Sequence, residues 1–418
     1  MEKFKIRGGA RLQGTLQVSG AKNSALPIMA ASLLSQGTVK LKGVPKLSDV
    51  HTMIELLQYL GAKAGWEGSA ARIDSAQVQT LEVTEDVMRR MRASNLVMGP
   101  LLARFGSFKV AYPGGCAIGS RPLELHLKGF AKMGAKVVEQ AGVITATAPN
   151  LRGAEIHLDF PSVGATENLM MAAALAQGTT VIKNAAREPE LVDLQNFINL
   201  MGGKVNGAGT DVIKIRGVDR LGGAIHQIIP DRIEAATHVI AAALTQGNVL
   251  LTNVIPEHLE PVIYKVRETG AQVEVDGDQI WIRGNEAYQA VDLKTMPYPG
   301  FPTDAQSLLM TLMTISRGTS IVSESIFENR FKQVGELRRM GADITIEGRI
   351  AVIKGVEKLS GTCVEAPDLR AGAALVLAGL IAEGTTVISA IQHIDRGYEN
   401  LEAKYASLGA DIVRTSDV

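Results

Sequence analysis

One cysteine of this chain lies in a segment that is poorly suited to a structural role. Residues 112–122 read Tyr-Pro-Gly-Gly-Cys-Ala-Ile-Gly-Ser-Arg-Pro, and the chain of 418 residues has only two cysteines. Glycine and proline at this density predict a surface loop, whereas a structural cysteine is normally buried in a helix or a strand. An exposed thiol is chemically vulnerable unless the protein uses it. Cys116 and the nearby Arg121 are therefore candidate functional residues.

Basic residues recur at corresponding positions along the chain. The first set, placed 14 or 15 residues before a glycine that follows an apolar segment, consists of Lys22, Arg92, Arg232 and Arg370. The second set, placed 12 residues after such a glycine, consists of Arg330 and Arg396. A cation at the start of a helix opposes the helix dipole, so stability alone would not select this pattern. An anionic ligand would, because backbone N–H groups and cations both attract phosphate or carboxylate.

Asp304 occupies the corresponding position in the fifth copy of this pattern, and Gly164 occupies it in the third. Next to Thr303, an acidic residue at this place is consistent with an ordinary residue at the start of a helix. A single carboxylate among converging cations is equally consistent with a general base. Both interpretations of Asp304 stay open on spacing alone.

Several classes of site are not supported by the sequence. The seven histidines show neither an HxxxH nor an HExxH spacing, so we expect no metal site. No P-loop is present, and no GxGxxG motif opens a helix after a strand, which argues against a nucleotide hydrolase and a Rossmann dehydrogenase. Lysine plus arginine and aspartate plus glutamate both number 43, so no basic surface for nucleic acid is indicated.

The apolar segments and the cysteines bear on the location of the protein. The longest apolar run, AGAALVLAGLIA at 371–382, is shorter than the ~18 residues that a membrane helix needs. Two cysteines cannot form a disulfide framework, which points to a reducing cytosol. The second one, Cys363, lies in a strand-like segment and is expected to be a small buried residue. We therefore expect a cytoplasmic protein without membrane insertion.

The most informative feature is a sixfold internal repeat. A glycine after an apolar helix recurs at Gly37, Gly106, Gly178, Gly247, Gly318 and Gly384, and a glycine that ends the next helix recurs at Gly61, Gly134, Gly202, Gly270, Gly341 and Gly409. Both markers repeat at intervals of about 70 residues. The pattern predicts an α/β protein of six units, gathered into two pseudo-symmetric halves. A solenoid of six units is the alternative, although solenoid repeats are usually shorter, about 20–45 residues.

The two helices of each unit differ in character. The second helix is amphipathic, with apolar residues at i, i+4 and i+7, and in the first unit Ser48 and Gly61 are its candidate caps. The first helix of each unit, such as NLMMAAALA at 168–176, is apolar on nearly every side. Helices of that kind belong in the interior. We therefore expect strands on the outside of a helical core.

Nine segments distributed over the whole chain carry a family resemblance. They are GAKNSALPIMAASLL (20–34), RASNLVMGPLLARFG (92–106), PGGCAIGSRPLELHLKG (113–129), FPSVGATENLMMAA (160–173), PDRIEAATHVIAAA (230–243), GFPTDAQSLLM (300–310), ESIFENRF (324–331), APDLRAGAALVLAGL (366–380) and IDRGYENLEAK (394–404). These segments resemble the enolpyruvyl transferase family, and within it the UDP-N-acetylglucosamine 1-carboxyvinyltransferases. The resemblance implies an inside-out α/β barrel with two domains of three repeats each. One domain would comprise residues 20–229, and the other residues 1–19 with 230–418.

The resemblance also implies a reaction. This bacterial family transfers the enolpyruvyl group of phosphoenolpyruvate to the 3′-hydroxyl of UDP-N-acetylglucosamine, through a tetrahedral ketal that loses phosphate, and so commits the sugar to peptidoglycan synthesis. Asp304 would accept the proton of the hydroxyl. Cys116, on a lid loop that also carries Arg121, would supply a proton to C3 of phosphoenolpyruvate. Lys22 and Arg396 would complete the catalytic set, and neither a cofactor nor a metal ion would be required.

The same resemblance assigns two sets of binding residues. Phosphoenolpyruvate would be bound by Lys22, Asn23, Arg121, Arg330, Arg370 and Arg396. The nucleotide sugar would be bound by Asn23, Arg92, Arg121, Pro122, Leu123, Glu124, Leu125, Ser162, Val163, Gly164, Asp304 and Ile326. The chain departs from the common family pattern in having Leu123-Glu124 in place of Val-Asp, and Phe160 where some members have lysine. Both departures lie next to the nucleotide site that the resemblance implies.

Two alternatives remain. An enzyme similar to enolpyruvylshikimate-phosphate synthase would share the repeats and phosphoenolpyruvate, but it lacks the PGGC loop. A catalytically silent relative would bind the nucleotide sugar without turning it over, although the intact set of Lys22, Cys116, Asp304 and Arg396 argues against this. The small-molecule substrates are the partners that the resemblance implies, and the sequence indicates no nucleic acid partner and no particular protein partner.

Overall fold

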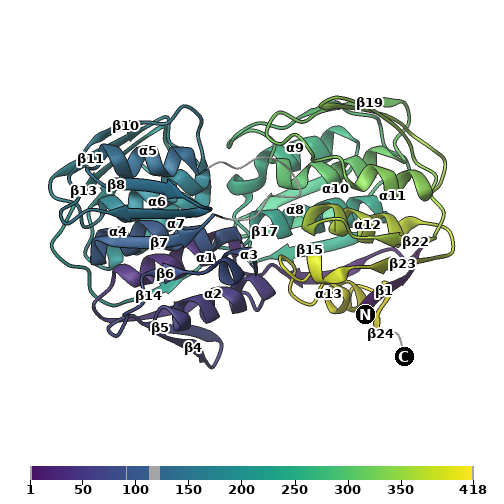
Figure 1. The fold of residues 1–418 in the computed structure, drawn as a ribbon. Coiled ribbons are helices and arrows are strands. Elements are labelled where there is room, and N and C mark those ends of the chain that lie inside the picture. Colours follow the sequence, from purple (N-terminus) through teal and green to yellow (C-terminus); the bar gives the residue numbers. More distant parts are fainter. Residues whose placement is uncertain (1, 91, 113–122, 417–418) are drawn as a thin grey trace. The chain divides into compact units, whose positions relative to one another are not determined.

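The computed structural model describes residues 2–90, 92–112 and 123–416, which form two compact units (Figure 1). The N-terminal unit comprises the described residues between 20 and 229. The C-terminal unit comprises residues 2–19 and 230–416. Each unit has its own hydrophobic core.

The N-terminal unit contains three four-stranded sheets, with strand orders β14-β3-β5-β4, β6-β7-β9-β8 and β10-β11-β13-β12. The strands are β3 (Thr38–Lys42), β4 (Lys63–Glu67), β5 (Ala70–Asp74), β6 (Glu82–Val83), β7 (Ser107–Ala111), β8 (Lys136–Gln140), β9 (Val143–Thr147), β10 (Glu155–His157), β11 (Thr179–Lys183), β12 (Val205–Asn206), β13 (Val212–Arg216) and β14 (Ala224–Gln227). In each sheet the first pair is parallel and the other two pairs are antiparallel.

The C-terminal unit repeats this topology in three further sheets, ordered β2-β15-β17-β16, β18-β19-β21-β20 and β22-β23-β1-β24. The strands are β1 (Glu2–Arg7), β2 (Gln13–Gln17), β15 (Asn248–Thr252), β16 (Gln272–Asp276), β17 (Gln279–Arg283), β18 (Leu293–Lys294), β19 (Thr319–Ser323), β20 (Asp343–Glu347), β21 (Ile350–Lys354), β22 (Cys363–Glu365), β23 (Thr385–Ser389) and β24 (Asp411–Ser416). The first pair of each sheet is again parallel and the others antiparallel. One topology therefore occurs six times, as the sequence repeat predicts.

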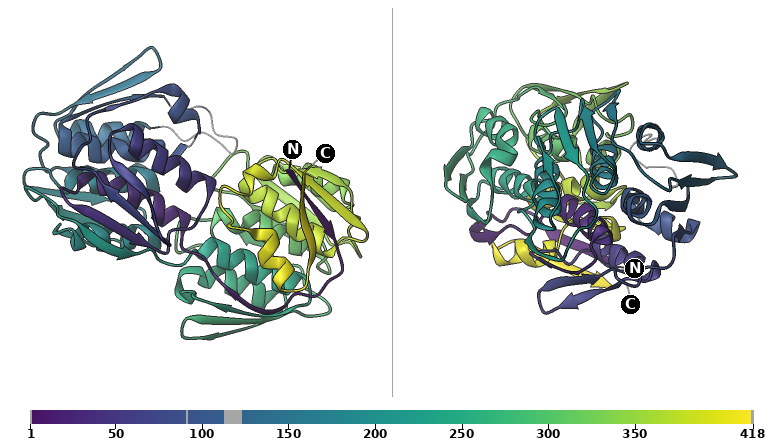
Figure 2. Two further views of the ribbon diagram at one scale, coloured as in Figure 1. Left: turned by 90° about the horizontal axis from the view of Figure 1, so that it is seen from below. Right: turned by 90° about the vertical axis from the view of Figure 1, so that its left-hand side faces the viewer.

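One helix of each repeat is buried along most of its length. These helices are α1 (Lys22–Ala31), α4 (Met98–Phe105), α6 (Val163–Ala173), α8 (Arg232–Leu244), α10 (Thr303–Met313) and α12 (Leu369–Ile381). In the C-terminal unit α8, α10 and α12 contact one another, and in the N-terminal unit α4 contacts α6. Sheets lie outside these helices within each unit (Figures 1 and 2). Helices that are apolar on nearly every side are thereby removed from water.

A second helix of each repeat is only partly buried. These helices are α2 (Ser48–Tyr59), α5 (Glu124–Lys132), α7 (Pro189–Leu200), α9 (Glu260–Glu268), α11 (Gln333–Arg339) and α13 (Leu401–Ser407). Short helical segments are α3 (Glu85–Arg90) and the 3-10 helices η1 (Ser32–Leu34), η2 (Arg92–Val97), η3 (Pro256–Leu259) and η4 (Ile391–His393). The glycine that follows each second helix has φ between 93° and 106° in all six repeats. The prediction of helix-ending glycines is therefore confirmed, because this left-handed conformation favours glycine.

Two local predictions from the sequence are wrong. Ser48 is the first helical residue of α2 and not its N-cap, which is Leu47 and provides no side-chain hydrogen bond. Cys363 lies in a strand, as expected, but its side chain is exposed. The side chain of its neighbour Val364 points into the core, and since successive side chains of a strand alternate between faces, Cys363 points outward.

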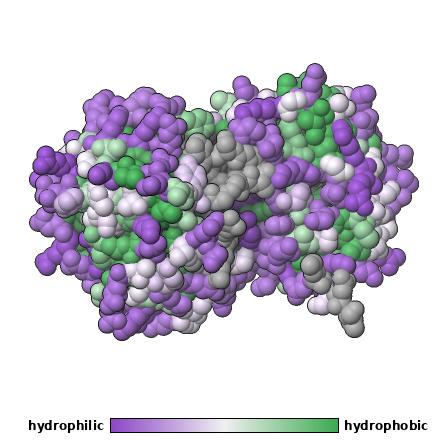
Figure 3. All heavy atoms as spheres, in the orientation of Figure 1, coloured by the Kyte–Doolittle hydropathy of each residue, from purple (hydrophilic) through white to green (hydrophobic). Residues whose placement is uncertain are grey.

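Hydrophilic residues cover most of the face drawn in Figure 3.

The helix-ending glycines allow a test of backbone strain without steric conflict. A Cβ atom at Gly341 would meet nothing within 4 Å, yet its φ is 98°. We expect Gly341→Ala to lower the free energy of unfolding by about 1–2 kcal/mol, since a left-handed alanine is strained by that amount. Gly335→Ala is the control, because Gly335 lies within α11 with equally open surroundings and no positive φ. That variant should be stabilised by about 0.5–1 kcal/mol. Chemical denaturation would measure both, and equal effects would contradict the argument.

Candidate active site

Asp304 lies between two buried arginines of the C-terminal unit. It is the second residue of α10, and its Oδ1 accepts a hydrogen bond of 2.6 Å from Arg330 Nη2. Its Oδ2 accepts one of 3.3 Å from Arg370 Nη2. The side chains of Arg330 and Arg370 are 4% and 5% exposed, whereas that of Asp304 is 27% exposed. Each oxygen of the carboxylate therefore contacts a buried guanidinium group, while the side chain as a whole stays partly exposed. Both ion pairs favour the ionised form of Asp304.

Arg370 belongs to the first turn of α12, where Asp368 is the N-cap. Its Nη1 donates a hydrogen bond of 3.1 Å to the hydroxyl of Tyr398. Burial lowers the pKa of this guanidinium, but Tyr398 and the carboxylates of Asp304 and Asp231 outweigh burial, so that the net pKa is raised. The guanidinium of Arg370 is thus permanently charged, and hydrogen bonds to Tyr398 and Asp304 hold its Nη1 and Nη2 groups.

Arg330 lies in the loop that joins β19 to α11. Besides Asp304 it contacts the ring of Phe327, at 5.7 Å from the ring centroid. Its Nε is buried and has no hydrogen-bond partner among the described residues. This N–H group is a donor that an anion or a water molecule could satisfy.

The loop that carries Ile326 is organised by Glu324, a residue that sequence analysis missed. Glu324 is buried, and its Oε1 accepts hydrogen bonds from the backbone N–H groups of Ile326 and Phe327 at 2.8 and 3.2 Å. Its carboxylate also accepts hydrogen bonds from the hydroxyls of Thr295 and Thr303. One buried carboxylate therefore joins this loop to the start of α10, next to Asp304. Its position in the ESIFENRF segment was the available signal.

Arg396 lies in a turn that packs against α12. A Cβ atom at Gly397 would be 2.7 Å from the side chain of Leu369, and one at Gly372 would be 2.7 Å from that of Ile394. The turn therefore fits closely over the first turns of α12, where Arg370 also lies. The structure thus brings Asp304, Arg330 and Arg370 into direct contact and places Arg396 on an adjoining turn.

Lys22 is the first residue of α1 in the N-terminal unit. Its Nζ lies 3.1 Å from Oδ2 of Asp49, the second residue of α2, and the two side chains are 9% and 6% exposed. A buried ion pair is costly to break, because the remaining charge loses its partner in a poorly solvated place. Asn23, next along α1, is half-buried. Asp49 was not predicted, and no spacing in the sequence relates it to Lys22.

The start of α6 and the start of α5 are joined in the N-terminal unit. Ser162 is the N-cap of α6, with its hydroxyl accepting a hydrogen bond from Ala165 N, and Val163 and Gly164 are the first helical residues. A Cβ atom at Gly164 would lie 3.4 Å from the ring of His126 on α5. The predicted residues Leu123, Glu124 and Leu125 at the start of α5 are therefore on a helix that packs beside Ser162, Val163 and Gly164.

A hydrogen-bond network fixes this packing. Asn168 Oδ1 accepts from the backbone N–H of Gly99 at 2.8 Å, so the other amide atom is Nδ2 and must donate to His126 Nδ1 at 3.2 Å. This places the proton of a neutral His126 on Nε2. The network therefore joins α4, α5 and α6.

The remaining predicted residues fall into two groups. Cys116, Arg121 and Pro122 lie outside the described residues. Arg92 begins the 3-10 helix η2 and not the buried helix α4, which starts at Met98, so its predicted place at a buried-helix start is wrong. In the other five repeats Lys22, Gly164, Arg232, Asp304 and Arg370 are the first or second residues of their buried helices, as predicted.

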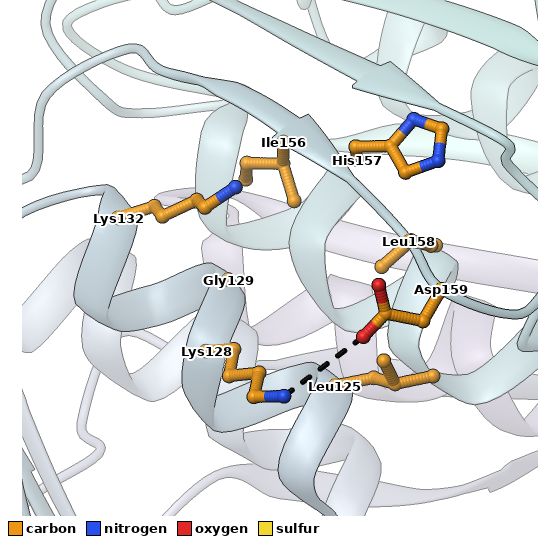
Figure 4. Close-up of a pocket in the computed structure, with 8 residues that line it drawn as sticks. All are labelled: Leu125, Lys128, Gly129, Lys132, Ile156, His157, Leu158 and Asp159. Carbon is orange, nitrogen blue, oxygen red and sulfur yellow. Dashed lines mark ion pairs between the residues drawn. The ribbon is translucent and has the colours of Figure 1, made fainter.

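A cavity of about 220 Å³ lies between α5 and β10. Figure 4 shows Lys128 and Lys132 of α5 on one side of it and Asp159 on the other, with Lys128 Nζ 3.8 Å from Asp159. Lys128 also pairs with Glu124 at 2.7 Å, and these side chains are more than half exposed. Exposed pairs of this kind contribute little to stability. Of the predicted site residues, Leu125 lines this cavity.

The described part of the chain holds no group of three or more histidine, cysteine, aspartate or glutamate side chains arranged for a metal ion. None of its helices combines the length and apolar character that a membrane span requires.

Glu167 of α6 generates a prediction on pH. Burial raises its pKa well above the usual value, and the negative charges of Glu190 and Glu188 raise it further. The unfolded chain therefore releases this proton near pH 4.5, whereas the folded chain retains it to higher pH, so stability is lost as the pH rises through the folded pKa. Glu167→Gln should remove this loss and melt at a higher temperature than the parent at pH 8, but not at pH 4.

The control is Glu155→Gln, which alters an exposed carboxylate paired with Lys183 on the surface of the same unit. Lys183 lowers the pKa of Glu155, so this carboxylate stays ionised at neutral and higher pH, and above about pH 6 the variant should show the same pH dependence of melting temperature as the parent protein. If the melting temperatures of Glu167→Gln and of the parent changed with pH in the same way from pH 4 to pH 8, the assignment would be contradicted.

Comparisons with known proteins cover the whole chain. A sequence profile of the family described as EPSP synthase (3-phosphoshikimate 1-carboxyvinyltransferase) matches residues 6–405. Two curated proteins of Carboxydothermus hydrogenoformans, named UDP-N-acetylglucosamine 1-carboxyvinyltransferase 1 and 2, are 59% and 56% identical to this chain. The alignments cover 100% of this chain, and 99% and 100% of those proteins.

Solved structures match over the same length. The enolpyruvyl transferase NikO from Streptomyces tendae has a TM-score of 0.89 at 24% identity, covering 100% of this chain and 99% of that chain. EPSP synthase from Acinetobacter baumannii has a TM-score of 0.76 at 19% identity, covering 100% of both chains. These matches establish the fold, and the predicted fold class, an inside-out α/β barrel of enolpyruvyl transferase type, is confirmed.

Proposed function

Because the chain belongs to the enolpyruvyl transferase family, we propose that it transfers the enolpyruvyl group of phosphoenolpyruvate to the 3′-hydroxyl of UDP-N-acetylglucosamine and releases phosphate. The full-length identity of 59% to a protein named UDP-N-acetylglucosamine 1-carboxyvinyltransferase supports these substrates. The EPSP synthase structures, by contrast, share 19% identity. The structural observation that carries the proposal is the carboxylate of Asp304 between Arg330 and Arg370.

The reaction has two steps that balance in protons. In the first, the 3′-oxygen forms a bond to C2 of phosphoenolpyruvate while its proton goes to a base and a second proton is added to C3. In the second, the bond from C2 to the phosphate oxygen breaks, and C3 loses a proton to restore the double bond. The protein must therefore supply a base, an acid and cations that stabilise the phosphate.

Asp304 is our candidate for the base, and its contacts suit that role. The two guanidinium groups keep it ionised and hold both oxygens in place, so its exposed edge has a defined direction. Each guanidinium has five N–H groups, of which one on each arginine contacts Asp304, which leaves further donors for an anion. We propose that Arg330, Arg370 and Arg396 bind phosphoenolpyruvate through N–H donors of their guanidinium groups. We also propose that Ile326 borders the nucleotide sugar.

The N-terminal unit would contribute the other binding residues. We propose that Lys22, oriented by Asp49, and Asn23 bind phosphoenolpyruvate. The start of α6 is suited to an anionic group, since backbone N–H groups at a helix N-terminus attract phosphate. Ser162, Val163 and Gly164, with Leu123, Glu124 and Leu125 on the adjoining α5, would therefore bind the nucleotide sugar. The same role is proposed from the sequence for Arg92, Arg121 and Pro122.

We further propose that the protein works in the bacterial cytoplasm, that residues 20–229 and residues 1–19 with 230–418 are its two domains, and that peptidoglycan synthesis consumes its product. The relatives with the proposed activity are bacterial. The two small-molecule substrates are the partners that the activity requires.

The direct test is phosphate release from the purified chain with both substrates present. We expect phosphate only when phosphoenolpyruvate and UDP-N-acetylglucosamine are combined, together with a new enolpyruvyl ether detected by mass spectrometry. Omission of either substrate is one control, and replacement of the nucleotide sugar by shikimate 3-phosphate is another. Phosphate release from phosphoenolpyruvate with shikimate 3-phosphate, but not with UDP-N-acetylglucosamine, would favour the enolpyruvylshikimate-phosphate synthase alternative. Binding of the nucleotide sugar without phosphate release would favour the catalytically silent one.

Asp304→Asn tests the proposed base. The amide keeps the shape of the side chain but cannot accept the proton, so turnover should fall by ~10²- to 10⁴-fold while binding of the nucleotide sugar persists. Steady-state kinetics and calorimetric titration would measure the two effects. Asp343→Asn, which changes an exposed carboxylate on β20, is the control and should leave turnover unchanged. Full activity of Asp304→Asn would return Asp304 to an ordinary helix-start residue.

Cys116 is tested by varying the acidity of its side chain. An aspartic acid at this position can donate a proton but cannot form a stable thioether, whereas serine is a far weaker acid and alanine has no proton to donate. Cys116→Asp should therefore keep substantial turnover, and Cys116→Ser and Cys116→Ala should be nearly inactive. Cys363→Ser is a suitable control, because it removes an exposed thiol with no proposed role. Retained turnover in Cys116→Ala would refute the assignment of the acid.

A further inference from the structure

Tyr398 contacts one proposed substrate-binding arginine, Arg370, and follows another, Arg396, by two residues. Its side chain is 2% exposed. Its hydroxyl contacts Arg370, and its backbone N–H donates a hydrogen bond of 3.1 Å to Ile394 O, closing the turn that carries Arg396. The same hydroxyl contacts Thr237 of α8 at 2.8 Å. Tyr398 therefore connects α8, α12 and this turn at a single buried point.

The direction of each hydrogen bond in this chain follows from the chemistry of the groups. A guanidinium can only donate, so the Tyr398 oxygen accepts from Arg370 Nη1. The hydroxyl of Thr237 donates to Ile233 O at 2.7 Å and is thereby committed. Thr237 Oγ1 must then accept the proton of the Tyr398 hydroxyl. The donors run from Arg370 through Tyr398 and Thr237 to a backbone carbonyl of α8, without ambiguity.

Such a chain restrains the guanidinium of Arg370 at one end while Asp304 restrains it at the other. Burial raises the pKa of Tyr398, although Arg370 and Thr237 lower it, so the hydroxyl remains protonated and can complete the chain. The helix α8, which carries Thr237, is buried over its whole run from Ile233 to Leu244. Hydrogen bonds through Tyr398 and Thr237 thus connect the guanidinium of Arg370 to this buried helix.

Arg330 offers a contrast within the same unit. It binds the other oxygen of Asp304 and also lies over an aromatic ring, but that ring belongs to Phe327, which has no hydroxyl. Arg370 lies over the ring of Tyr398 at 5.5 Å from its centroid, a similar distance. The aromatic contact is therefore common to both arginines, and the hydroxyl is specific to Arg370.

We propose that Tyr398 is a positioning residue for phosphoenolpyruvate: its hydroxyl holds the guanidinium of Arg370 at a fixed angle to Asp304, and its place in the chain holds the turn of Arg396 against α12. This inference rests on the proposed function. Tyr398 acts through Arg370 and needs no contact with substrate.

Tyr398→Phe is the first test, measured in the full-length protein with both substrates. The ring and its packing are kept, but one hydrogen bond to a charged group is lost. We expect the KM for phosphoenolpyruvate to rise about tenfold and the KM for UDP-N-acetylglucosamine to stay unchanged. The change in kcat should be smaller than the change in the KM for phosphoenolpyruvate. A merely structural role would instead lower the amount of folded enzyme without separating the two KM values.

Tyr405→Phe is the matched control. Tyr405 is fully buried in the same unit, and its hydroxyl contacts His238 Nδ1 at 3.3 Å and none of the proposed substrate-binding arginines that the structure describes. This variant should lose stability to a similar extent and leave both KM values unchanged. Thr237→Val, which removes the acceptor for the Tyr398 proton, should raise the KM for phosphoenolpyruvate in the same direction by a smaller factor.

A double-mutant cycle with Arg370→Ala separates action through Arg370 from an independent effect. In the Arg370→Ala background, Tyr398→Phe should have no further effect on kcat/KM for phosphoenolpyruvate. Additive losses, or an unchanged KM in Tyr398→Phe, would overturn the inference. If Tyr398→Phe does not fold, Thr237→Val decides in its place. Absence of phosphate release by the parent protein would refute the proposed function, and it would be seen before any variant is compared.

Discussion

The carboxylate of Asp304 is shared by two buried guanidinium groups, and much of the C-terminal unit is arranged to maintain that contact. Arg330 and Arg370 would be costly to bury without it, because an unpaired charge in the interior loses its hydration with no compensation. Asp304 and Arg370 begin neighbouring helices, α10 and α12, which pack against each other. The acidic residue is favoured by the dipole of its helix, whereas Arg370 is not. Their mutual attraction offsets that cost, and binding of an anion would offset it further.

Buried polar residues outside the proposed binding set contact the candidate binding residues or the elements that carry them. Glu324 joins the loop of Ile326 to the start of α10, and Tyr398 joins Arg370 to α8. In the N-terminal unit, Asp49 pairs with Lys22, and Asn168 joins three helices beside the start of α6. Each of these groups is a buried polar side chain whose hydrogen bonds are directional. Such bonds restrict orientation in a way that apolar packing, which is not directional, cannot.

Local periodicity explains which features of the fold were predictable. The helix-ending glycines could be located because a left-handed residue favours glycine wherever it occurs, and the apolar helices could be located because their composition allows no exposed face. Predictions that depended on a single residue in its surroundings were less successful. Cys363 lies in the expected strand, but its exposure depends on which face of that strand is covered. Arg92 has the expected spacing, yet a 3-10 helix precedes the buried helix in that repeat alone among those described.

By itself the sequence determined the six repeats, the α/β class and the family, because these depend on patterns within a repeat and on segments that resemble known relatives. It also identified Lys22, Asp304, Arg330, Arg370 and Arg396 as candidates through their spacing or resemblance. Only the tertiary structure decided which of them touch: Asp304 with Arg330 and Arg370, and Lys22 with Asp49. The physical reason is that ion pairs and hydrogen bonds act over a few ångströms between residues that are 26 to 66 positions apart in the chain. Contacts of this kind depend on how the helices pack, which no local pattern in the sequence specifies.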